Sequence, residues 1–214
     1  MKIYAIRHGE TIWNKERRLQ GQMGSDLDEE GVLLAEMTAE ALKDVHFDLC
    51  FSSPLIRARH TAEILLEGRE TPIVEDERIM EISFGIWEGK GCGPTNMEIP
   101  EPVYRCFHKD PFGYEPPEGG ETIEEVIART GDFYRDITGR EELQDKTILI
   151  ATHGCAIRGI LNNVYEDKKD FWHGGVPMNC AVSMVEIKDG VEKLVLDDQV
   201  YYPEKYFKSF YVKK

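Results

Sequence analysis

Two histidines lie far apart in the chain, and each is followed by glycine. His8 stands in Arg7-His8-Gly9 after a short apolar run, and His153 stands in Thr152-His153-Gly154 after a longer one. Imidazole can act as nucleophile, base or ligand near neutral pH. Arginine offers a planar fork of donors suited to phosphate or carboxylate. A lone Arg-His-Gly also fits a strand end with a solvated arginine, so a chemical role needs support from other groups.

Three further side chains could join these histidines. Arg57 lies in the opening turns of a predicted helix over 55–66, directly after a predicted strand over 48–52. The free N–H groups and dipole at a helix start favour anions. Glu81 lies between apolar neighbours, and such a setting disfavours the charged form of a carboxyl group and keeps an acid protonated. The alternative is that Glu81 is one more surface carboxylate. Asn14 could turn its amide toward the first histidine.

The elements that must position these groups alternate between strands and helices. The first predicted strand surrounds Ile3 and Ala5. The other predicted strands are 48–52, 72–74, 146–151, 182–187 and 191–196, and Asp189-Gly190 between the last two predicts a hairpin turn. The predicted helices are 26–42, 55–66, 103–108, 121–138 and 155–161, with one or two helical turns within 10–18. Ser52-Ser53-Pro54 predicts a capped start for the helix over 55–66. This order predicts an α/β three-layer sandwich with a mostly parallel central sheet and helices on both faces. Reactive groups that follow strands would then meet at the carboxyl ends of those strands.

One segment, 90–121, differs in composition from the rest. It holds six of the ten prolines and a scatter of glycines. Long irregular segments in compact domains are usually functional, so we predict a small cap insertion over the carboxyl ends of the strands. The chain, 1–214, is expected to form a single domain that contains this cap. The aromatic tail, 201–214, would either pack across the sheet or form a dimer contact, so both a monomer and a homodimer remain open.

Composition excludes several classes of function. Forty acidic residues against 26 basic ones give a formal charge of −14, which argues against nucleic acid as a partner. Five cysteines without a CxxC pair suggest neither a zinc site nor a disulfide framework, and they fit a reducing cytoplasm. No apolar run approaches the roughly 20 residues of a membrane span, and the start lacks a signal peptide. We therefore expect a cytoplasmic protein without a membrane partner.

Four separated motifs occur in a fixed order along the chain. They are Arg7-His8-Gly9-Glu10-Thr11 with Trp13-Asn14; Ser52-Ser53-Pro54-Leu55 with Arg57-Ala58 and Thr61-Ala62; Glu81-Ile82 with Phe84-Gly85 and Trp87-Glu88-Gly89; and Thr152-His153-Gly154. In this order and spacing the motifs resemble those of the histidine phosphatase superfamily. The resemblance is to its phosphoglycerate mutase-like branch, in particular the small bacterial phosphatases, and spans residues 1–165.

The resemblance implies a role for each motif residue. His8 would be the nucleophile that takes the phosphoryl group onto a ring nitrogen. Arg7, Arg57 and His153 would hold the phosphate oxygens, and Asn14 would assist. This suits phosphoryl transfer, in which charge spreads over three oxygens and catalysis is mostly positioning and electrostatics. A neutral imidazole is a competent nucleophile only when its other nitrogen is held by an acceptor, and a backbone carbonyl near the following glycine turn is the candidate.

Glu81 would be the general acid that protonates the leaving alkoxide and then the base that activates water. Gln20 and Gly21 fall where the family approaches the rest of the substrate, and Gly154 belongs to the phosphate-binding motif. The cap would shape specificity. The expected partner is a small phosphorylated metabolite, and the design requires no metal and no cofactor. Arg59, His60 and Cys155 are expected to be structural, surface and packing groups, whereas His108 lies in the cap and could touch substrate.

The function expected from the resemblance is hydrolysis of small phosphate monoesters through a phosphohistidine. Mutases of the family have a threonine-glycine where this chain has Gln20-Gly21, and they have a longer cap, so both departures favour hydrolysis. A phosphoglycerate mutase and an α-ribazole phosphatase are alternatives within the family. An alternative of another class is a non-catalytic regulator that binds a phospholigand. Such a regulator would be expected to lack one of His8, Glu81 or His153, and all three are present.

Overall fold

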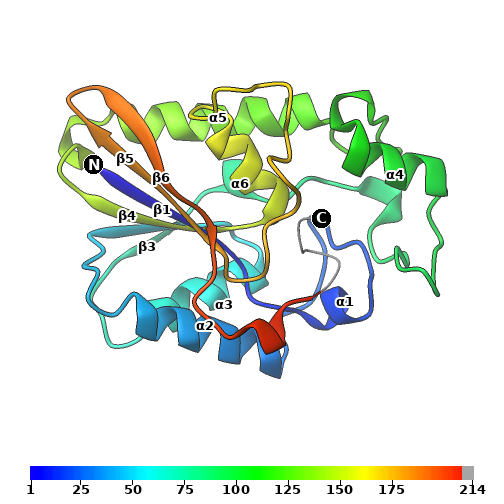
Figure 1. The fold of residues 1–214 in the computed structure, drawn as a ribbon, viewed down its shortest axis with the longest axis horizontal. Helices are drawn as coiled ribbons and strands as arrows, with labels where there is room; N and C mark the ends of the chain where they lie inside the picture. The colour runs from blue at the N-terminus through cyan, green and yellow to red at the C-terminus, as the bar shows by residue number, and fades with distance from the viewer. Residues whose placement is uncertain (209–214) are drawn as a thin grey trace.

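The computed structural model describes residues 1–208, and a six-stranded sheet lies at the centre of this part of the chain (Figure 1). The strands in sequence order are β1 (Lys2–Arg7), β2 (Leu49–Ser52), β3 (Ile73–Glu75), β4 (Thr147–Thr152), β5 (Val182–Lys188) and β6 (Val191–Gln199). The spatial order is β3-β2-β4-β1-β5-β6. Strands β1 to β4 are parallel, whereas β5 runs antiparallel to β1 and β6 runs antiparallel to β5. The predicted mostly parallel sheet is confirmed.

Helices cover both faces of this sheet. They are α1 (Ile12–Lys15), α2 (Glu29–Ala41), α3 (Ile56–Leu65), α4 (Glu101–Lys109), α5 (Ile123–Gly139) and α6 (Gly154–Leu161). Helices α2 and α3 lie on one face, and α5 and α6 lie on the other (Figure 1). Helix α4 lies away from both pairs, beyond the carboxyl ends of the parallel strands. The three-layer α/β sandwich is confirmed.

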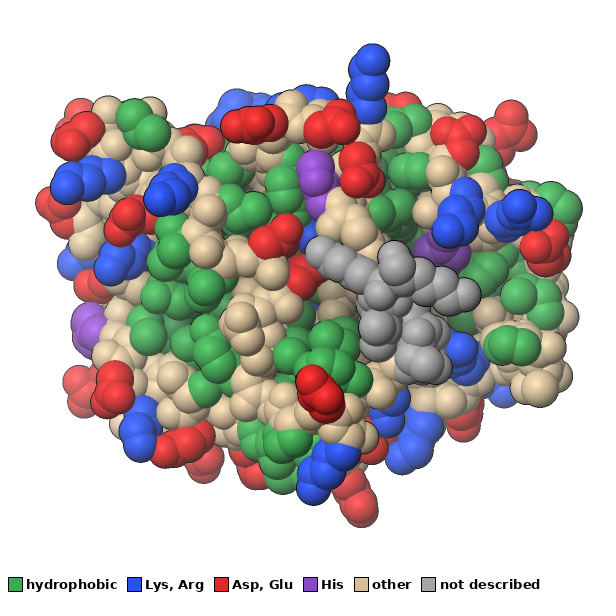
Figure 2. All heavy atoms as spheres, viewed as in Figure 1, with side chains coloured by type: hydrophobic (Ala, Val, Ile, Leu, Met, Phe, Trp, Pro, Cys, Tyr) green, Lys and Arg blue, Asp and Glu red, His purple; other side chains and the backbone are tan. Residues whose placement is uncertain are grey.

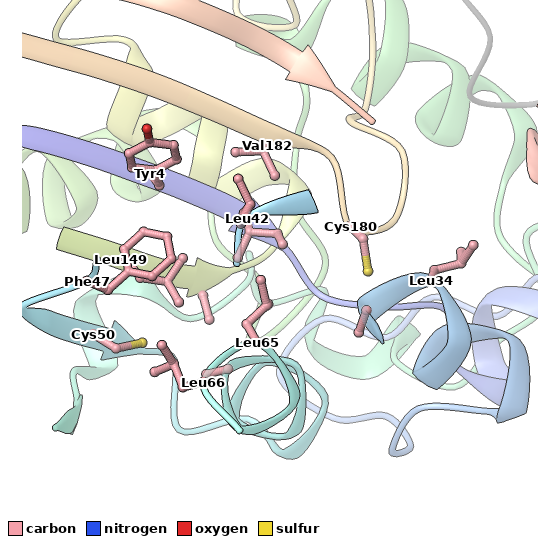
Figure 3. Close-up of a cluster of buried hydrophobic side chains, with 14 of the residues drawn as sticks. Tyr4, Leu34, Leu42, Phe47, Cys50, Leu65, Leu66, Leu149, Cys180 and Val182 are labelled. Carbon is pink, nitrogen blue, oxygen red and sulfur yellow. The ribbon is translucent and has the colours of Figure 1, made fainter. Parts of the chain in front are cut away.

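The apolar character of β1 follows from its central position. Its side chains alternate between the two faces, as in any strand. Ile3 and Ala5 pack with the cluster that α5 and α6 cover, and Tyr4 and Ile6 pack with the cluster under α2 and α3. Figure 3 shows the second cluster, in which Tyr4 lies near side chains from several elements. Because both faces are buried, the strand reads as a continuous apolar run.

The helical segment expected within 10–18 is a single turn, α1, and Arg17 just after it adopts a left-handed backbone with φ of 57°. The helix predicted over 55–66 corresponds to α3 with its caps, Leu55 and Leu66. The serines before Pro54 were expected to cap the next helix, but the N-cap of α3 is Leu55, with no side-chain cap bond. The hydroxyl of Ser53 accepts from the Leu55 N–H at 3.3 Å and lies 2.8 Å from His153 Nε2. Ser53 therefore links the start of α3 to the site.

The two antiparallel strands form the predicted hairpin. Asp189 and Gly190 at its turn both have positive φ, 53° and 77°, which is the conformation that an Asp-Gly turn adopts. In the described part of the tail, Tyr202, Tyr206 and Phe207 pack against the cluster under α2 and α3. This part therefore packs on the sheet layer, as one of the two expectations had it, and 209–214 lie outside the described residues.

None of the helices in residues 1–208 is long and apolar enough to cross a membrane. Figure 2 shows acidic and basic side chains interspersed over the face it presents, without a continuous basic area. Large exposed apolar side chains in the described part are scattered, with Ile86 on the turn after Glu81 and Val191 at the hairpin.

Candidate active site

Three parallel strands end at one edge of the sheet and bring the predicted residues together. Strand β1 ends at Arg7, β4 ends one residue before His153, and β2 precedes α3 and its Arg57. A pocket of about 140 Å³ opens at this edge. The predicted residues that line it are Arg7, His8, Asn14, Gln20, Gly21, Arg57 and Glu81.

The His8 imidazole is held in a defined state. Its Nδ1 lies 2.7 Å from the carbonyl oxygen of Gly9, so this nitrogen carries the proton and donates it. Its Nε2 accepts a hydrogen bond of 3.3 Å from Arg57 Nε. Burial, together with the positive charges of Arg57 and Arg7, holds the pKa of His8 well below its usual range. The ring is therefore neutral at neutral pH, with a lone pair on Nε2.

Gly9 allows the chain to turn beneath α2 just after β1 ends. A Cβ at Gly9 would lie only 2.6 Å from the carbonyl oxygen of Gly31 in α2. The Gly9 N–H also donates to Thr61 Oγ1 at 3.0 Å. A side chain at this position would push the helix away and release the carbonyl that holds His8, so the glycine is a packing requirement.

Arg57 is almost fully buried, with 1 % of its surface exposed. Its Nη2 donates to the carbonyl of Gly21 at 2.6 Å, and its Nη1 donates to the carbonyl of Met23 at 2.8 Å. Burial and the nearby charge of Arg7 lower the pKa of Arg57 to about 10, which leaves it charged at neutral pH. The guanidinium is thus fixed in the plane that brings Nε to His8.

The loop that supplies these two carbonyls is itself held by Glu88. The Glu88 carboxylate accepts hydrogen bonds from the backbone N–H groups of Gln22 at 2.9 Å, Met23 at 2.8 Å and Phe84 at 3.0 Å. Gly21 has a φ of +56°, and a Cβ there would overlap Glu88 Oε1, so a glycine is required. Glu88 connects the loop that orients Arg57 with the turn that follows Glu81.

Gln20 and Gly21 were expected to approach the substrate. Both line the pocket, but their polar groups also bind protein. Gln20 Oε1 accepts from Thr11 Oγ1 at 3.0 Å, and the Gly21 carbonyl accepts from Arg57. Asn14 also lines the pocket, and its Oδ1 accepts from the Thr11 backbone at 3.3 Å, which closes the cap of α1.

His153 lies behind the pocket wall and is fully buried. Its ring centroid is 5.2 Å from that of His8, and its Nε2 pairs with Ser53 Oγ at 2.8 Å. Its Nδ1 has no hydrogen-bond partner among the described residues. Burial and the charge of Arg57 hold the pKa of His153 well below its usual range. Two neutral imidazoles therefore lie side by side below one guanidinium.

Glu81 is fixed from both its side chain and its backbone. Its carboxyl group accepts hydrogen bonds from the N–H groups of Ile82 at 3.0 Å and Cys155 at 3.1 Å, in the first turn of α6. The Glu81 carbonyl accepts from Arg129 Nη2 at 3.0 Å, and Arg129 pairs with Glu121 at 2.7 Å. A Cβ on Gly154 would lie 3.8 Å from both Glu81 Oε2 and Arg7 Nε. These contacts place the carboxyl group beside the phosphate-binding candidates.

The connection between α6 and β5 supports the first strand end from the other side. Arg7 Nη1 donates to the carbonyl of Pro177 at 2.5 Å, and Asn179 Nδ2 donates to the carbonyl of His8 at 3.0 Å. The fully buried Arg158 binds the carbonyl of Gly175 at 2.7 Å and pairs with Asp198. This connection thus holds the backbone on which the site depends.

The other titratable candidates lie elsewhere or pack. Arg59 pairs with Glu63 at 2.8 Å on the surface of α3, and His60 pairs with Asp26 at 2.8 Å. Both were expected to be structural or surface groups, and their contacts agree. Cys155 is buried, and burial raises the pKa of its thiol well above the usual range, as suits packing. His108 lines the pocket, as the cap position allowed.

Sequence reasoning missed several supporting groups. Ser53 and Glu88 stand inside the quoted motifs, but nothing in their spacing shows that they bind His153 and the loop after Gln20. Asn179 and Arg129 lie outside those motifs. The sequence gives no signal for Asn179, whose burial (3 % exposed) only the structure shows, whereas an arginine within the predicted amphipathic helix over 121–138 indicates a polar partner.

Comparison with known proteins agrees with this geometry. A family model, the histidine phosphatase superfamily (branch 1), matches residues 3–198. Phosphoserine phosphatase 1 from Hydrogenobacter thermophilus is 29% identical over 88% of this chain and 88% of its own length. A 2,3-bisphosphoglycerate-dependent phosphoglycerate mutase from Gloeobacter violaceus is 30% identical over 74% of this chain and 73% of its own.

Among solved structures, the YhfR protein of Bacillus stearothermophilus superposes with a TM-score of 0.84 and 32% identity, over 93% of this chain and 97% of that one. The relatives include phosphatases, which supports phosphatase activity for this protein. Sequence and fold agree over nearly the whole described chain, and the protein therefore belongs to branch 1 of the histidine phosphatase superfamily.

Proposed function

We propose that this protein hydrolyses small phosphate monoesters through a covalent phosphohistidine on His8. The observation that carries the proposal is the state of the His8 ring. Its Nδ1 proton is bound by the Gly9 carbonyl at 2.7 Å, and its Nε2 faces Arg57 Nε at 3.3 Å. A phosphoryl group bound by Arg57 would therefore meet the nitrogen that carries the lone pair.

The first step forms a P–N bond and breaks the ester P–O bond. His8 Nε2 attacks the phosphorus atom, and the electron pair of the ester bond leaves on the alcohol oxygen. Arg7 and Arg57 would neutralise the equatorial oxygens, with Asn14 at the edge. His153 would bind them through Nδ1, which has no partner among the described residues. Gly154 leaves room for Val176, because a Cβ there would lie 2.9 Å from the Val176 side chain. Charge in the transition state spreads over these oxygens, so donors that are already fixed lower the barrier.

Glu81 supplies and recovers the proton. As a carboxylic acid it protonates the leaving alkoxide, and as a carboxylate it then takes a proton from water. The resulting hydroxide attacks the phosphorus, the P–N bond breaks, and Nε2 regains its lone pair. The hydrogen bonds from Ile82 and Cys155 support this role because they hold the carboxyl group at one place beside the pocket.

The cycle is proposed to need no metal and no cofactor. Two guanidiniums already provide the positive charge that a metal ion would bring to the phosphoryl oxygens. Among residues 1–208, no group of three or more histidine, cysteine or acidic side chains is arranged to hold a metal ion. Segment 90–121 contributes Cys92, Tyr104, Phe107 and His108 to the pocket lining and is proposed to act as the cap within a single domain.

Hydrolysis is favoured over phosphoglycerate interconversion on two grounds. The chain has Gln20-Gly21 where mutases resemble one another in a threonine-glycine, and its cap segment is short. A mutase must exclude water and reorient its intermediate beneath a fuller lid. Proteins similar to this chain are named phosphoserine phosphatase and phosphoglycerate mutase. An α-ribazole phosphatase would need the same reacting groups.

The decisive experiment measures both the phosphate released and the label bound to the enzyme. The protein is mixed with ³²P-labelled phosphate monoester, with and without EDTA, and quenched in alkali, where a phosphohistidine survives and phosphoserine does not. We expect label on His8, phosphate release in both samples, and release faster than phosphoglycerate interconversion. Labelled enzyme with faster interconversion would assign a mutase. Binding of phosphate without label or turnover would assign a regulator, and loss of turnover with EDTA would contradict the metal-free cycle.

A further inference from the structure

The pocket wall away from His8 is aromatic. Five rings line it, and they come from three separate parts of the chain: Phe84, Tyr104, Phe107, His108 and Trp172. Tyr104, Phe107 and His108 belong to α4, Phe84 begins the turn after Glu81, and Trp172 lies in the connection between α6 and β5. A substrate whose phosphate meets His8 would extend its alcohol group toward these rings.

The rings are fixed before any ligand binds. Phe107 contacts Phe84 and Trp172 edge to face, with both centroid distances at 5.2 Å. The Trp172 Nε1–H donates to the Phe107 carbonyl at 2.8 Å, so the indole cannot turn. His108 stands edge to face with Tyr104 at 4.7 Å. A ring that enters meets a wall in the offset and edge-to-face geometries that aromatic groups prefer.

This wall carries no negative charge. Among the described lining residues, Glu81 is the single carboxylate, and the catalytic cycle uses it. Arg17 and Arg18 also line the pocket, and Arg18 pairs with Glu16 at 2.8 Å. Burial lowers the pKa of His108 to about 4, so its ring is neutral at neutral pH. An ammonium group on a substrate would therefore find no carboxylate in the pocket lining other than Glu81.

The pocket of about 140 Å³ spans both the His8 end and the aromatic wall, so the phosphate and the group bonded to it share one small space. An aromatic wall favours contact with another ring. We infer that the preferred substrates are phosphate monoesters whose alcohol carries an uncharged six-membered ring, in preference to esters of amino alcohols such as phosphoserine. The inference rests on the proposed function and concerns only the alcohol side of the same pocket.

The test compares esters whose leaving alcohols have similar reactivity. Benzyl phosphate and phosphoethanolamine are both esters of primary alcohols, and they differ in carrying a ring or an ammonium group; O-phosphoserine is the third substrate. We expect kcat/KM for benzyl phosphate to exceed that for either amino ester by at least about tenfold, in line with aromatic burial and contact. Equal values, or a preference for O-phosphoserine, would overturn the inference while leaving the phosphatase proposal intact. Hydrolysis of none of the three would overturn both.

Variants of α4 then locate the effect. Tyr104→Ala and His108→Ala should each lower kcat/KM for benzyl phosphate by about fivefold, the value of one aromatic contact, and should change phosphoethanolamine turnover less than twofold. Arg105→Ala, exposed on the same helix, is the matched control and should match wild type on both esters. The phosphoethanolamine rate also reports whether each variant is folded. An equal loss on both esters in Tyr104→Ala and His108→Ala would contradict a role in recognising the ring.

Discussion

The two ends of the pocket are built by different means. Around His8, polar side chains are held by backbone groups: the Gly9 carbonyl orients the imidazole, and the carbonyls of Gly21 and Met23 orient Arg57. Around His108, side-chain rings hold one another, with few hydrogen bonds. Hydrogen bonds to fixed backbone groups allow little displacement, whereas ring contacts tolerate exchange of one apolar group for another.

This contrast has a physical reason. A reacting phosphoryl group needs donors at fixed positions, because a preorganised donor costs nothing to reorient during the reaction. The alcohol side needs only shape and low polarity, which irregular segments such as 90–121 can supply. Substitutions at the His8 end should therefore reduce the rate for every ester, and substitutions at the His108 end should change the ranking of esters.

The largest effect is expected for His8→Ala. Removal of a covalent nucleophile costs on the order of 10⁴- to 10⁶-fold in kcat. Hydrolysis of p-nitrophenyl phosphate measures the loss. His46→Ala, at an exposed histidine remote from the pocket, should behave as wild type. A loss of less than tenfold in His8→Ala would contradict a covalent role for this residue.

A smaller but still large effect is expected for Arg57→Ala. Loss of one fixed donor to the transition state typically costs about 100- to 1000-fold, and the cost should be similar for benzyl and amino esters. Arg59→Ala changes an arginine two residues away whose partners, Glu63 and Glu75, lie on the surface. Its kcat/KM should stay within about twofold of wild type. Equal losses in the two variants would show that burial of Arg57 is unrelated to function.

Glu88→Gln should give a moderate loss, because glutamine keeps only one of the two oxygens that hold the backbone of Gln22 and Met23. We expect about a tenfold lower kcat, since Glu88 acts by positioning Arg57. Inorganic phosphate should also inhibit less strongly, which separates loss of Arg57 alignment from a general loss of folded enzyme. Glu118→Gln, an exposed residue near the same turn, is the control. Unchanged phosphate inhibition in Glu88→Gln would contradict this linkage.

The smallest effect concerns stability at mildly acidic pH. The pKa of His8 is lowered by burial and by Arg57 and Arg7, so the unfolded chain binds a proton that the folded chain does not. This contribution to stability is present above the unfolded pKa of about 6.5 and is lost as pH falls below it toward the folded pKa, by up to about 1.4 kcal/mol per pH unit. Urea unfolding of wild type and His8→Gln between pH 7.5 and 5.5 measures it. The variant should lose less stability on acidification, and parallel curves would refute the linkage.

Much of the fold could be predicted from patterns along the chain. The continuous apolar run before Thr152 predicted a central strand because both faces of β4 are buried. The Asp-Gly pair predicted the hairpin because its residues accept positive φ. One or two helical turns were predicted within 10–18, and the structure has one, because Arg17 ends α1 with a left-handed backbone. The sequence does not show this ending, because arginine rarely adopts that conformation.

The functional site, like the fold, could be predicted from the sequence only in part. The sequence by itself determined which reactive groups exist and that His8, Arg57 and His153 follow strands, because residue type and apolar periodicity are local properties. Only the tertiary structure decided that Ser53 binds His153, that Glu88 holds the loop behind Arg57, and that Asn179 binds the carbonyl of His8. These partners are separated by 66 to 171 residues, and a hydrogen bond between such distant segments depends on packing that no local pattern encodes.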